Sequence, residues 1–352
     1  MKFKQLSNLA VFAIIFSIAS TQVQAGMLRD KLKERLQQRN EDGSGDLSEL
    51  GGAGSSMSCE DWAKKVNSST KQNNDKNSGP TPDLKDVAYG SGNLEKLDVF
   101  LPKKSAYNDL APMMLMVHGG GLCVGDKGGA VMTQNKVARW VPKGFVFISI
   151  NYPMINDGKN ALAQANYVAK AAAFVQANAQ KWGGNSTKLI LMGHSAGAHL
   201  VSLVNADAQI RQANSLHPIL GTVSLDAGAV DVVKQMPNVY PFLKARYTEA
   251  FGTTEAEWIT ASPFQKLAKT AAPYAAAPWL GVCSTKRKDN PCAQATAYAE
   301  KSNGLGIKSA VLPESKSHKA INEELGLSGS YTSGVEAFMA SLDPTVAKRL
   351  SH

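Results

Sequence analysis

The sequence lacks any long hydrophobic run beyond its first 25 residues. A helix that spans a bilayer needs about 20 apolar residues, whereas residues 9–20 (LAVFAIIFSIAS) form an apolar run of only 12. The CxxC and Cys/His spacings of zinc sites are missing too, so no metal site is predicted. No basic stripe alternates with aromatic residues, which argues against nucleic-acid binding. The 352 residues show no internal repeat and suit one large α/β domain better than two small ones.

The first 25 residues are typical of a secretory signal peptide. Lys2 and Lys4 precede the apolar run, and Val23 and Ala25 occupy the −3 and −1 positions of a cleavage site. An uncleaved membrane anchor is the alternative. Removing residues 1–25 leaves 36 basic and 29 acidic residues, so the net charge falls from +9 to +7. We therefore expect a periplasmic or secreted protein that starts near Gly26 and has no transmembrane segment after cleavage.

Cysteines are few, and in an exported chain their even number indicates disulfide bonds. Four are present, Cys59, Cys123, Cys283 and Cys292, and an oxidising compartment favours disulfides. The simplest of the three possible pairings joins Cys283 to Cys292 around a short loop and leaves Cys59 with Cys123. Two free thiols in the loop, with Cys283 as a buried strand residue, are the alternative.

Two regions of different character follow the predicted signal peptide. Residues 26–85 form an N-terminal extension, which the polar segment 66–83 predicts to be partly flexible. Residues 86–352 have the regular pattern of a catalytic domain. Residues 230–275 interrupt that pattern and predict an insertion over the C-terminal edge of the sheet, where ligands bind in this architecture.

Short apolar runs alternate with helical spacing in the second region, which predicts a mostly parallel sheet with helices on both faces. We expect strands over 87–89, 97–101, 113–117, 145–150, 188–192, 219–225, 279–283 and 309–312, and helices over 160–181, 196–206, 293–303 and from 321.

The strongest chemical signal is the sequence Gly-His-Ser-Ala-Gly at residues 193–197. A serine hydroxyl is a poor nucleophile unless it is exposed, rigid and aimed at a base. A sharp turn between a strand and a helix provides this, and Gly193 and Gly197 relieve its crowding. KLILM precedes the motif and AHLVSLVNA follows it, so Ser195 is the predicted nucleophile. A glycine-rich turn without catalysis is the alternative.

A second glycine motif, His118-Gly119-Gly120-Gly121, follows the strand MMLMV. Attack by a serine creates an oxyanion that needs preplaced donors, and glycine allows the backbone to approach closely. Together with the serine motif, this sequence predicts an oxyanion hole made by the amides of Gly120, Gly121 and Ala196.

The base and the acid should follow the serine, because the order in this fold is Ser, acid, His. Elimination among the six histidines leaves His318, which follows the strand SAVLP. The acid must hold the imidazole tautomer and lie at the end of a strand. Asp289 is the first candidate, since it follows WLGVCSTKRK and precedes His318 by 29 residues. Asp226 and Asp231, after the preceding strand, are the alternative.

The motifs HGGG, GHSAG and the late SHKAIN together resemble the carboxylesterase branch of the α/β-hydrolases. That branch includes esterases like hormone-sensitive lipase, proteins like feruloyl esterase, and kynurenine formamidase. The segment FGTTEAEWITASPFQKL resembles the region between strands six and seven in those proteins. The resemblance covers roughly residues 87–342. It implies hydrolysis of esters or activated amides by a Ser-Asp-His triad without a cofactor.

Three functions remain open at this point. The first is a serine carboxylesterase that acts on small-molecule esters with short or medium acyl or aryl groups. The second is an arylformamidase or amidase with the same triad, because one triad and one oxyanion hole serve both leaving groups. The third is a non-catalytic binding protein on a hydrolase scaffold. The sequence leaves the natural substrate and the oligomeric state undetermined.

Overall fold

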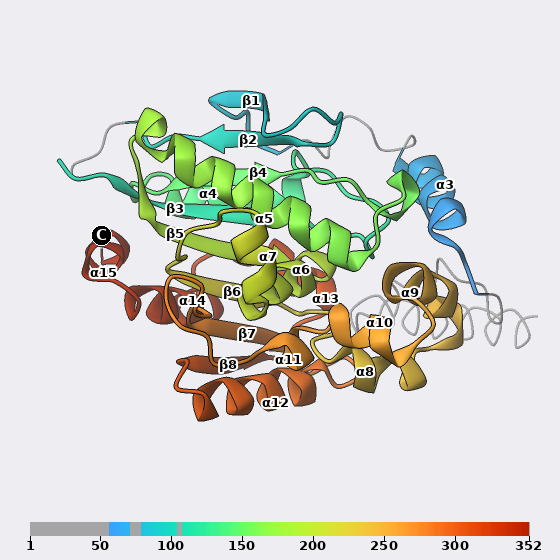
Figure 1. Ribbon diagram of the computed structural model, residues 1–352. Helices are drawn as coiled ribbons and strands as arrows, with labels where there is room; N and C mark the ends of the chain where they lie inside the picture. The colour runs from blue at the N-terminus through green and yellow to red at the C-terminus, as the bar shows by residue number, and fades with distance from the viewer. Residues whose placement is uncertain (1–55, 71–78, 104–107, 352) are drawn as a thin grey trace, which may run out of the picture.

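A computed structural model describes residues 56–70, 79–103 and 108–351, which form a central sheet covered by helices on both faces (Figure 1). The predicted signal peptide, residues 1–25, and the extension up to residue 55 lie outside the described residues.

Eight described strands form one sheet in the order β1-β2-β4-β3-β5-β6-β7-β8. β2 pairs antiparallel with both β1 and β4, and every other neighbouring pair is parallel. The expectation of an α/β-hydrolase fold is confirmed. The strands are β1 (Leu84–Ala88), β2 (Lys96–Phe100), β3 (Ala111–Val117), β4 (Val146–Ile150), β5 (Gly184–His194), β6 (Gly221–Leu225), β7 (Trp279–Ser284) and β8 (Ser309–Glu314).

The central strands read as continuous apolar runs because helices cover both of their faces. All seven residues of β3 are buried. Since successive side chains of a strand point to opposite faces, Met113 and Leu115 belong to one core cluster, and Met114 and Met116 to the other. Each alternate set of side chains therefore anchors a different layer of helices.

The helices are distributed over the two faces and one end of the sheet. α5 and α6 contribute to the first core cluster, α4, α14 and α15 to the second, and α12 packs on β7 and β8. The α-helices are α3 (Cys59–Thr70), α4 (Ala130–Trp140), α5 (Ala161–Asn178), α6 (Ala196–Ala206), α7 (Ala208–Ala213), α8 (Val232–Gln235), α9 (Lys244–Phe251), α10 (Glu255–Thr260), α11 (Pro263–Lys266), α12 (Pro291–Gly304), α13 (His318–Glu323), α14 (Ser330–Ala340) and α15 (Pro344–Leu350).

The chain between β6 and β7 contains four short α-helices, of which α8, α9 and α10 lie together beside one end of the sheet (Figure 1). β5 ends at this end of the sheet, and its last residue, His194, directly precedes Ser195. The segment expected as an insertion over 230–275 thus stands next to the serine motif.

Both expected disulfides are present. Cys59 at the start of α3 is bonded to Cys123, and Cys283 on β7 is bonded to Cys292 on α12. The first bond fixes the N-terminal helix α3 to the loop after β3, and the second closes the loop between β7 and α12.

Candidate active site

Ser195 occupies a strained turn between β5 and α6. Its φ of 55° lies in the left-handed region, which side chains seldom adopt outside functional sites. A Cβ at Gly193 would come within 2.2 Å of the Gly197 carbonyl oxygen, and one at Gly197 within 2.2 Å of the Val117 oxygen. Only glycine fits at these two positions. The turn leaves Ser195 partly exposed on the wall of a pocket.

The glycine motif after β3 forms a tight loop next to this serine. Gly120 and Gly121 have φ values of 110° and 63°, and the Gly120 carbonyl accepts hydrogen bonds from the amides of Cys123 and Val124 at 3.1 Å. Gly121 and Ala196 line the pocket beside Ser195. Two of the three residues predicted for the oxyanion hole thus line the same pocket as the serine.

His118 supports the glycine loop from beneath. Its ring is buried and stacks on Tyr152 with the ring centroids 4.5 Å apart, and its Nδ1 lies 2.8 Å from the Gly119 carbonyl oxygen. The Tyr152 hydroxyl donates to the His118 carbonyl at 2.8 Å. Burial lowers the pKa of His118, so the ring is neutral and Nδ1 donates to the carbonyl. His118 and Gly119 shape the loop rather than line the pocket.

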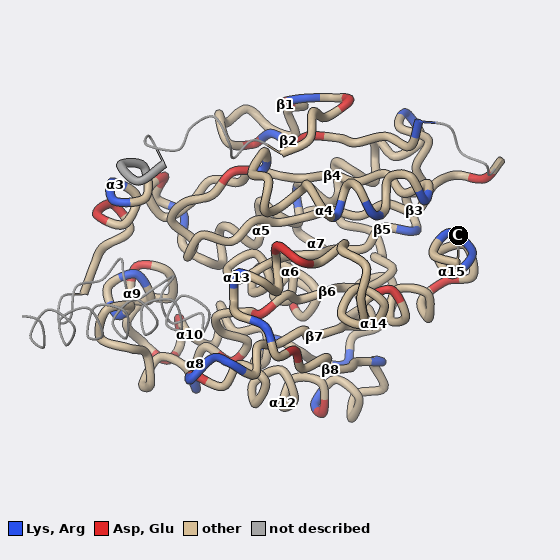
Figure 2. Tube along the Cα trace, turned by 180° about the vertical axis from the view of Figure 1, so that it is seen from behind, with Lys and Arg blue, Asp and Glu red and all other residues tan. Residues whose placement is uncertain are grey.

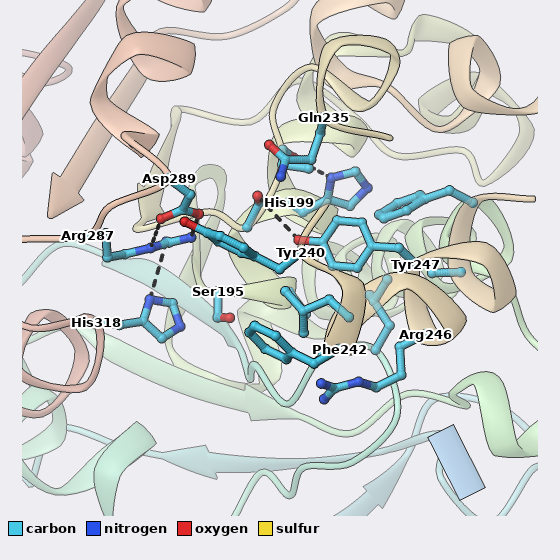
Figure 3. A pocket seen from close by; sticks show the side chains of 18 of the residues that line it. Ser195, His199, Gln235, Tyr240, Phe242, Arg246, Tyr247, Arg287, Asp289 and His318 are labelled. Carbon is cyan, nitrogen blue, oxygen red and sulfur yellow. Dashed lines mark hydrogen bonds and ion pairs between the residues drawn. The ribbon is translucent and has the colours of Figure 1, made fainter. Parts of the chain in front are cut away.

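His318 and Asp226 are in direct contact. His318 begins α13 after β8, and its Nδ1 lies 2.5 Å from Oδ2 of Asp226. Asp226 directly follows β6 and is fully buried. Its Oδ1 accepts a hydrogen bond from the Ser284 amide at 2.9 Å. Figure 3 shows the His318 ring next to Ser195 at one side of the pocket. The structure thus places Ser195 and His318 on the same pocket and Asp226 against the Nδ1 of His318.

The expectation that Asp289 holds His318 is wrong. Asp289 lines the pocket, but its carboxylate is bound by Arg287, which lies between it and the histidine (Figure 3). Asp226 adjoins the last residue of β6, whereas Asp289 comes five residues after the end of β7, in a loop that turns back to the disulfide. The other alternative, Asp231, caps α8 by accepting the Lys234 amide.

Sequence reasoning missed Arg287. Its Nη1 lies 3.0 Å from Oδ2 of Asp226, the same oxygen that contacts His318, and it also donates to the Asp226 carbonyl at 3.3 Å. Burial alone would lower the pKa of Arg287, but Asp226 and Asp289 raise it above its usual value. Burial likewise opposes ionisation of Asp226, yet the His318 hydrogen bond and the Arg287 charge hold its pKa well below the usual range. Asp226 is therefore an anion at neutral pH. The run Lys286-Arg287-Lys288, next to the candidate acid Asp289, is the sequence signal that could have pointed to Arg287.

Two further groups hold the segment that carries His318. The His194 ring lies 4.6 Å from the His318 ring, centroid to centroid, and its Nε2 contacts the His318 carbonyl oxygen at 3.0 Å. Burial lowers the pKa of His194 well below its ordinary value, so a neutral His194 donates this bond. From α4, the buried Lys136 amine donates to the carbonyl and side-chain oxygens of Asn322 at 2.6 and 3.0 Å.

The pocket itself has a volume of about 460 Å³ and is walled by the segment between β6 and β7. Ser195, Ala196 and His199 line it at the start of α6, and another wall comes mainly from α9 and the turn before it. That wall is largely aromatic and apolar: Tyr240, Phe242, Leu243, Tyr247, Ala250 and Phe251. The composition suits an apolar or aromatic substrate group.

The described residues contain no group of three or more His, Cys, Asp or Glu side chains that could hold a metal ion. None of the described helices is both long and apolar enough to cross a membrane.

Comparison with known proteins places these features among hydrolases. Residues 97–276 match the BD-FAE protein family. Kynurenine formamidase of Danio rerio is 30% identical over 150 residues, which cover 42% of this chain and 47% of that protein. Esterase LipQ of Mycobacterium tuberculosis is 31% identical over 124 residues, 35% of this chain and 29% of that protein. The match thus spans about half or less of these relatives.

Two solved structures share the fold at low sequence identity. Esterase B from Lactobacillus rhamnosis has a TM-score of 0.61 at 15% identity, and the match covers 82% of this chain and 93% of that one. A truncated carbohydrate esterase from gut microbiota has a TM-score of 0.61 at 18% identity, with 75% and 99% covered.

Proposed function

The chain belongs to the BD-FAE family, and on that premise we propose that it is a serine hydrolase that cleaves carboxylic esters with Ser195, His318 and Asp226 as its catalytic triad. One observation carries the proposal. The hydroxyl-bearing turn at Ser195, whose φ is 55°, opens into the same pocket as His318, whose Nδ1 is held by a buried, ionised Asp226.

The first half of the reaction follows from this geometry. The His318 Nε2 removes the proton from the Ser195 hydroxyl while the serine oxygen attacks the ester carbonyl carbon. Asp226 keeps the Nδ1 proton in place and stabilises the imidazolium ion. The carbonyl oxygen becomes an oxyanion, and the amides of Gly121 and Ala196, with Gly120 beside them, are the donors assigned to it.

The second half restores the serine. The imidazolium gives its proton to the alcohol oxygen, the carbon–oxygen bond breaks, and the alcohol leaves an acyl group on Ser195. Water then enters, loses a proton to His318 and attacks the acyl carbon. The carboxylic acid departs, and Ser195 regains its proton.

Replacement of Ser195 tests the proposal. We expect Ser195→Ala to fold normally, to lose turnover by about 10⁴–10⁶-fold and to lose labelling by a fluorophosphonate probe. The wild-type protein should carry the label on Ser195 alone. Equal labelling of the alanine variant would overturn the assignment, and an unlabelled, inactive wild type would favour the non-catalytic binding protein.

An arylformamidase is the second candidate. The match to kynurenine formamidase and the aromatic wall of the pocket favour it, since the same triad can attack a formyl carbon. Para-nitrophenyl esters of rising chain length, measured against one aryl formamide, separate the two activities. A higher kcat/KM for the formamide than for every ester would replace the first candidate by the second.

We also propose that the protein works outside the cytoplasm. The disulfides Cys59–Cys123 and Cys283–Cys292 support this location, because such bonds persist in oxidising compartments. Sequencing the N-terminus of the exported protein should find Gly26 or a close neighbour, whereas an intact Met1 on a cytoplasmic protein would contradict the signal peptide.

A further inference from the structure

Arg246 differs from every other described arginine. Arg139, Arg287 and Arg349 pair with carboxylates, and Arg211 donates to backbone carbonyls. Arg246 is only 4% exposed, yet none of the described residues accepts a hydrogen bond from it, and its Nε is buried without an acceptor. A buried N–H group without an acceptor costs free energy that a hydrogen bond to an anionic ligand would offset.

The position of Arg246 points to the substrate pocket. It lies on α9 and lines the cavity that also contains Ser195 and His318. Its Nη1 is 3.9 Å from the point that a Cβ on Gly121 would occupy, so it adjoins the glycine loop. Figure 3 shows its guanidinium end beneath Phe242, whose ring lies between it and Ser195 in this view.

The N-terminal extension holds this arginine in place. Trp62 of α3 stacks on the guanidinium, with Arg246 Cζ 4.3 Å from the ring centroid. The Cys59 amide donates to Glu249 of α9 at 2.9 Å, and Cys59 is bonded to Cys123 in the loop after β3. Stacking uses the face of a guanidinium and leaves its in-plane N–H groups free to donate. Arg246 is therefore preorganised as a donor without an acceptor.

The other charges around the pocket strengthen this interpretation. Its charged lining consists of Arg246, Lys286, Arg287, Lys288 and Asp289. Arg287 and Asp289 pair with each other, whereas no described carboxylate pairs with Arg246, Lys286 or Lys288. The pocket thus has an excess of positive charge in an otherwise aromatic wall, which favours an anionic ligand.

We propose that Arg246 binds a carboxylate on the substrate, so that the enzyme acts on esters that carry one negative charge in the acyl or the alcohol part. The planar fork of a guanidinium matches a carboxylate with two parallel hydrogen bonds. One arginine between aromatic walls suits one charge rather than the two of a phosphate group. This inference rests on the proposed esterase function and names the substrate class of the same site.

Two matched pairs of esters test the proposal. Phenyl hydrogen adipate and phenyl hexanoate differ by a carboxylate in the acyl part, and para-carboxyphenyl butyrate and phenyl butyrate differ by one in the alcohol part. A hydrogen bond to a charged group contributes about 1.5–3 kcal/mol, which corresponds to a preference of roughly tenfold to a hundredfold. The wild type should show such a preference in kcat/KM for the anionic member of at least one pair.

Substitution of Arg246 should remove this preference. In Arg246→Met the ratio of the two kcat/KM values should fall to about one, and in Arg246→Lys, which keeps the charge but loses the fork, it should be intermediate. Lys286→Met is the matched control, because it removes one exposed positive charge from the same pocket. Its effect on the ratio should be smaller and should vanish in high salt. Fluorophosphonate titration normalises each variant to its active fraction.

The outcomes separate this inference from the proposed function. Titration calorimetry of the Ser195→Ala protein with the same esters measures the preference without turnover. Hydrolysis that depends on Ser195 but shows no anionic preference in either pair would overturn the role of Arg246 alone. An unchanged ratio in Arg246→Met would overturn it as well. Turnover that survives in Ser195→Ala would instead contradict the proposed function.

Discussion

At the scale of single residues, one carboxylate oxygen has two partners. Oδ2 of Asp226 contacts both His318 Nδ1, at 2.5 Å, and Arg287 Nη1, at 3.0 Å. A triad acid must orient the imidazole and stabilise its cation, and Arg287 competes for part of that charge. It also holds Asp289 away from the histidine. The two carboxylates that follow neighbouring strands therefore have different tasks.

Amide substitutions distinguish the two carboxylates. In Asp226→Asn the side chain keeps its shape but loses its charge, and the wrong imidazole tautomer is favoured, so we expect kcat to fall by about 10³–10⁴-fold. Asp289→Asn, the matched control, should lower kcat by less than about tenfold. Steady-state kinetics on one phenyl ester measure both. A larger loss in the Asp289 variant would restore that residue as the acid.

Ser195 and the glycine loop could be predicted because each lies in a local motif whose backbone requirements can be recognised in the sequence, and His318 was found by elimination among the six histidines. The acid was not readable in this way. Asp226 and Asp289 both follow an apolar strand, and the choice depends on which carboxylate reaches His318, a residue 92 positions away from Asp226. Long-range contacts of this kind, with Arg287 between the candidates, leave no local pattern in the chain.

At the scale of elements, α4 holds α13 through a buried amine. The sequence did not predict α4 (Ala130–Trp140), because its buried face includes Thr133 and Lys136 beside Met132 and Trp140, and so its apolar spacing is hidden. Lys136 donates to Asn322 at the end of the short helix that begins with His318. Lys136, which interrupts the apolar spacing of α4, is thus also the residue that holds the helix carrying His318.

Replacing Lys136 tests this connection. Lys136→Met keeps the volume but leaves the Asn322 oxygens without their donor, so we expect a loss of about 1–3 kcal/mol in stability and a fall in kcat larger than any change in KM. Burial lowers the pKa of Lys136 from 10.5 to about 7. The unfolded chain then binds more protons between these values, so wild-type stability should rise with pH from 7 to 10.5. That rise should be weaker in the variant, as measured by urea unfolding.

The loop between β7 and α12 contains a feature that the sequence did predict, a disulfide bond. The bond between Cys283 and Cys292 closes the segment that carries both Arg287 and Asp289. A double Cys→Ala variant should lose roughly 2–3 kcal/mol of stability, and its kcat should fall because Arg287 is less well held against Asp226. Non-reducing peptide mapping checks the bond. Unchanged kcat in a folded variant would separate the loop from catalysis.

At the scale of the whole molecule, charge is spread widely while several titratable rings are hidden. Lysines, arginines and carboxylates occur on many elements along the trace (Figure 2), with a net charge of +9 for the sequence. By contrast His118, His194 and His199 are buried, each at 7% exposure or less. His118 lies in the loop after β3, His194 ends β5, and His199 lies on α6. The segments around Ser195 therefore contain three buried imidazoles that are neutral at pH 7.

These rings make stability depend on pH with a definite sign. Burial lowers the pKa of His118, lowers that of His194 well below its ordinary value, and lowers that of His199 to about 4. An unfolded histidine titrates near 6.5, so unfolding below that pH takes up protons and the free energy of unfolding must fall as the solution is acidified. Each ring contributes a slope of about 1.4 kcal/mol per pH unit between its unfolded and folded pKa. Denaturant unfolding at pH 7, 6 and 5 should show this decline. In His199→Gln the free energy of unfolding should fall less steeply with pH, by the contribution of one histidine. Constant or rising stability from pH 7 to pH 5 would mean that these rings are already protonated in the folded protein.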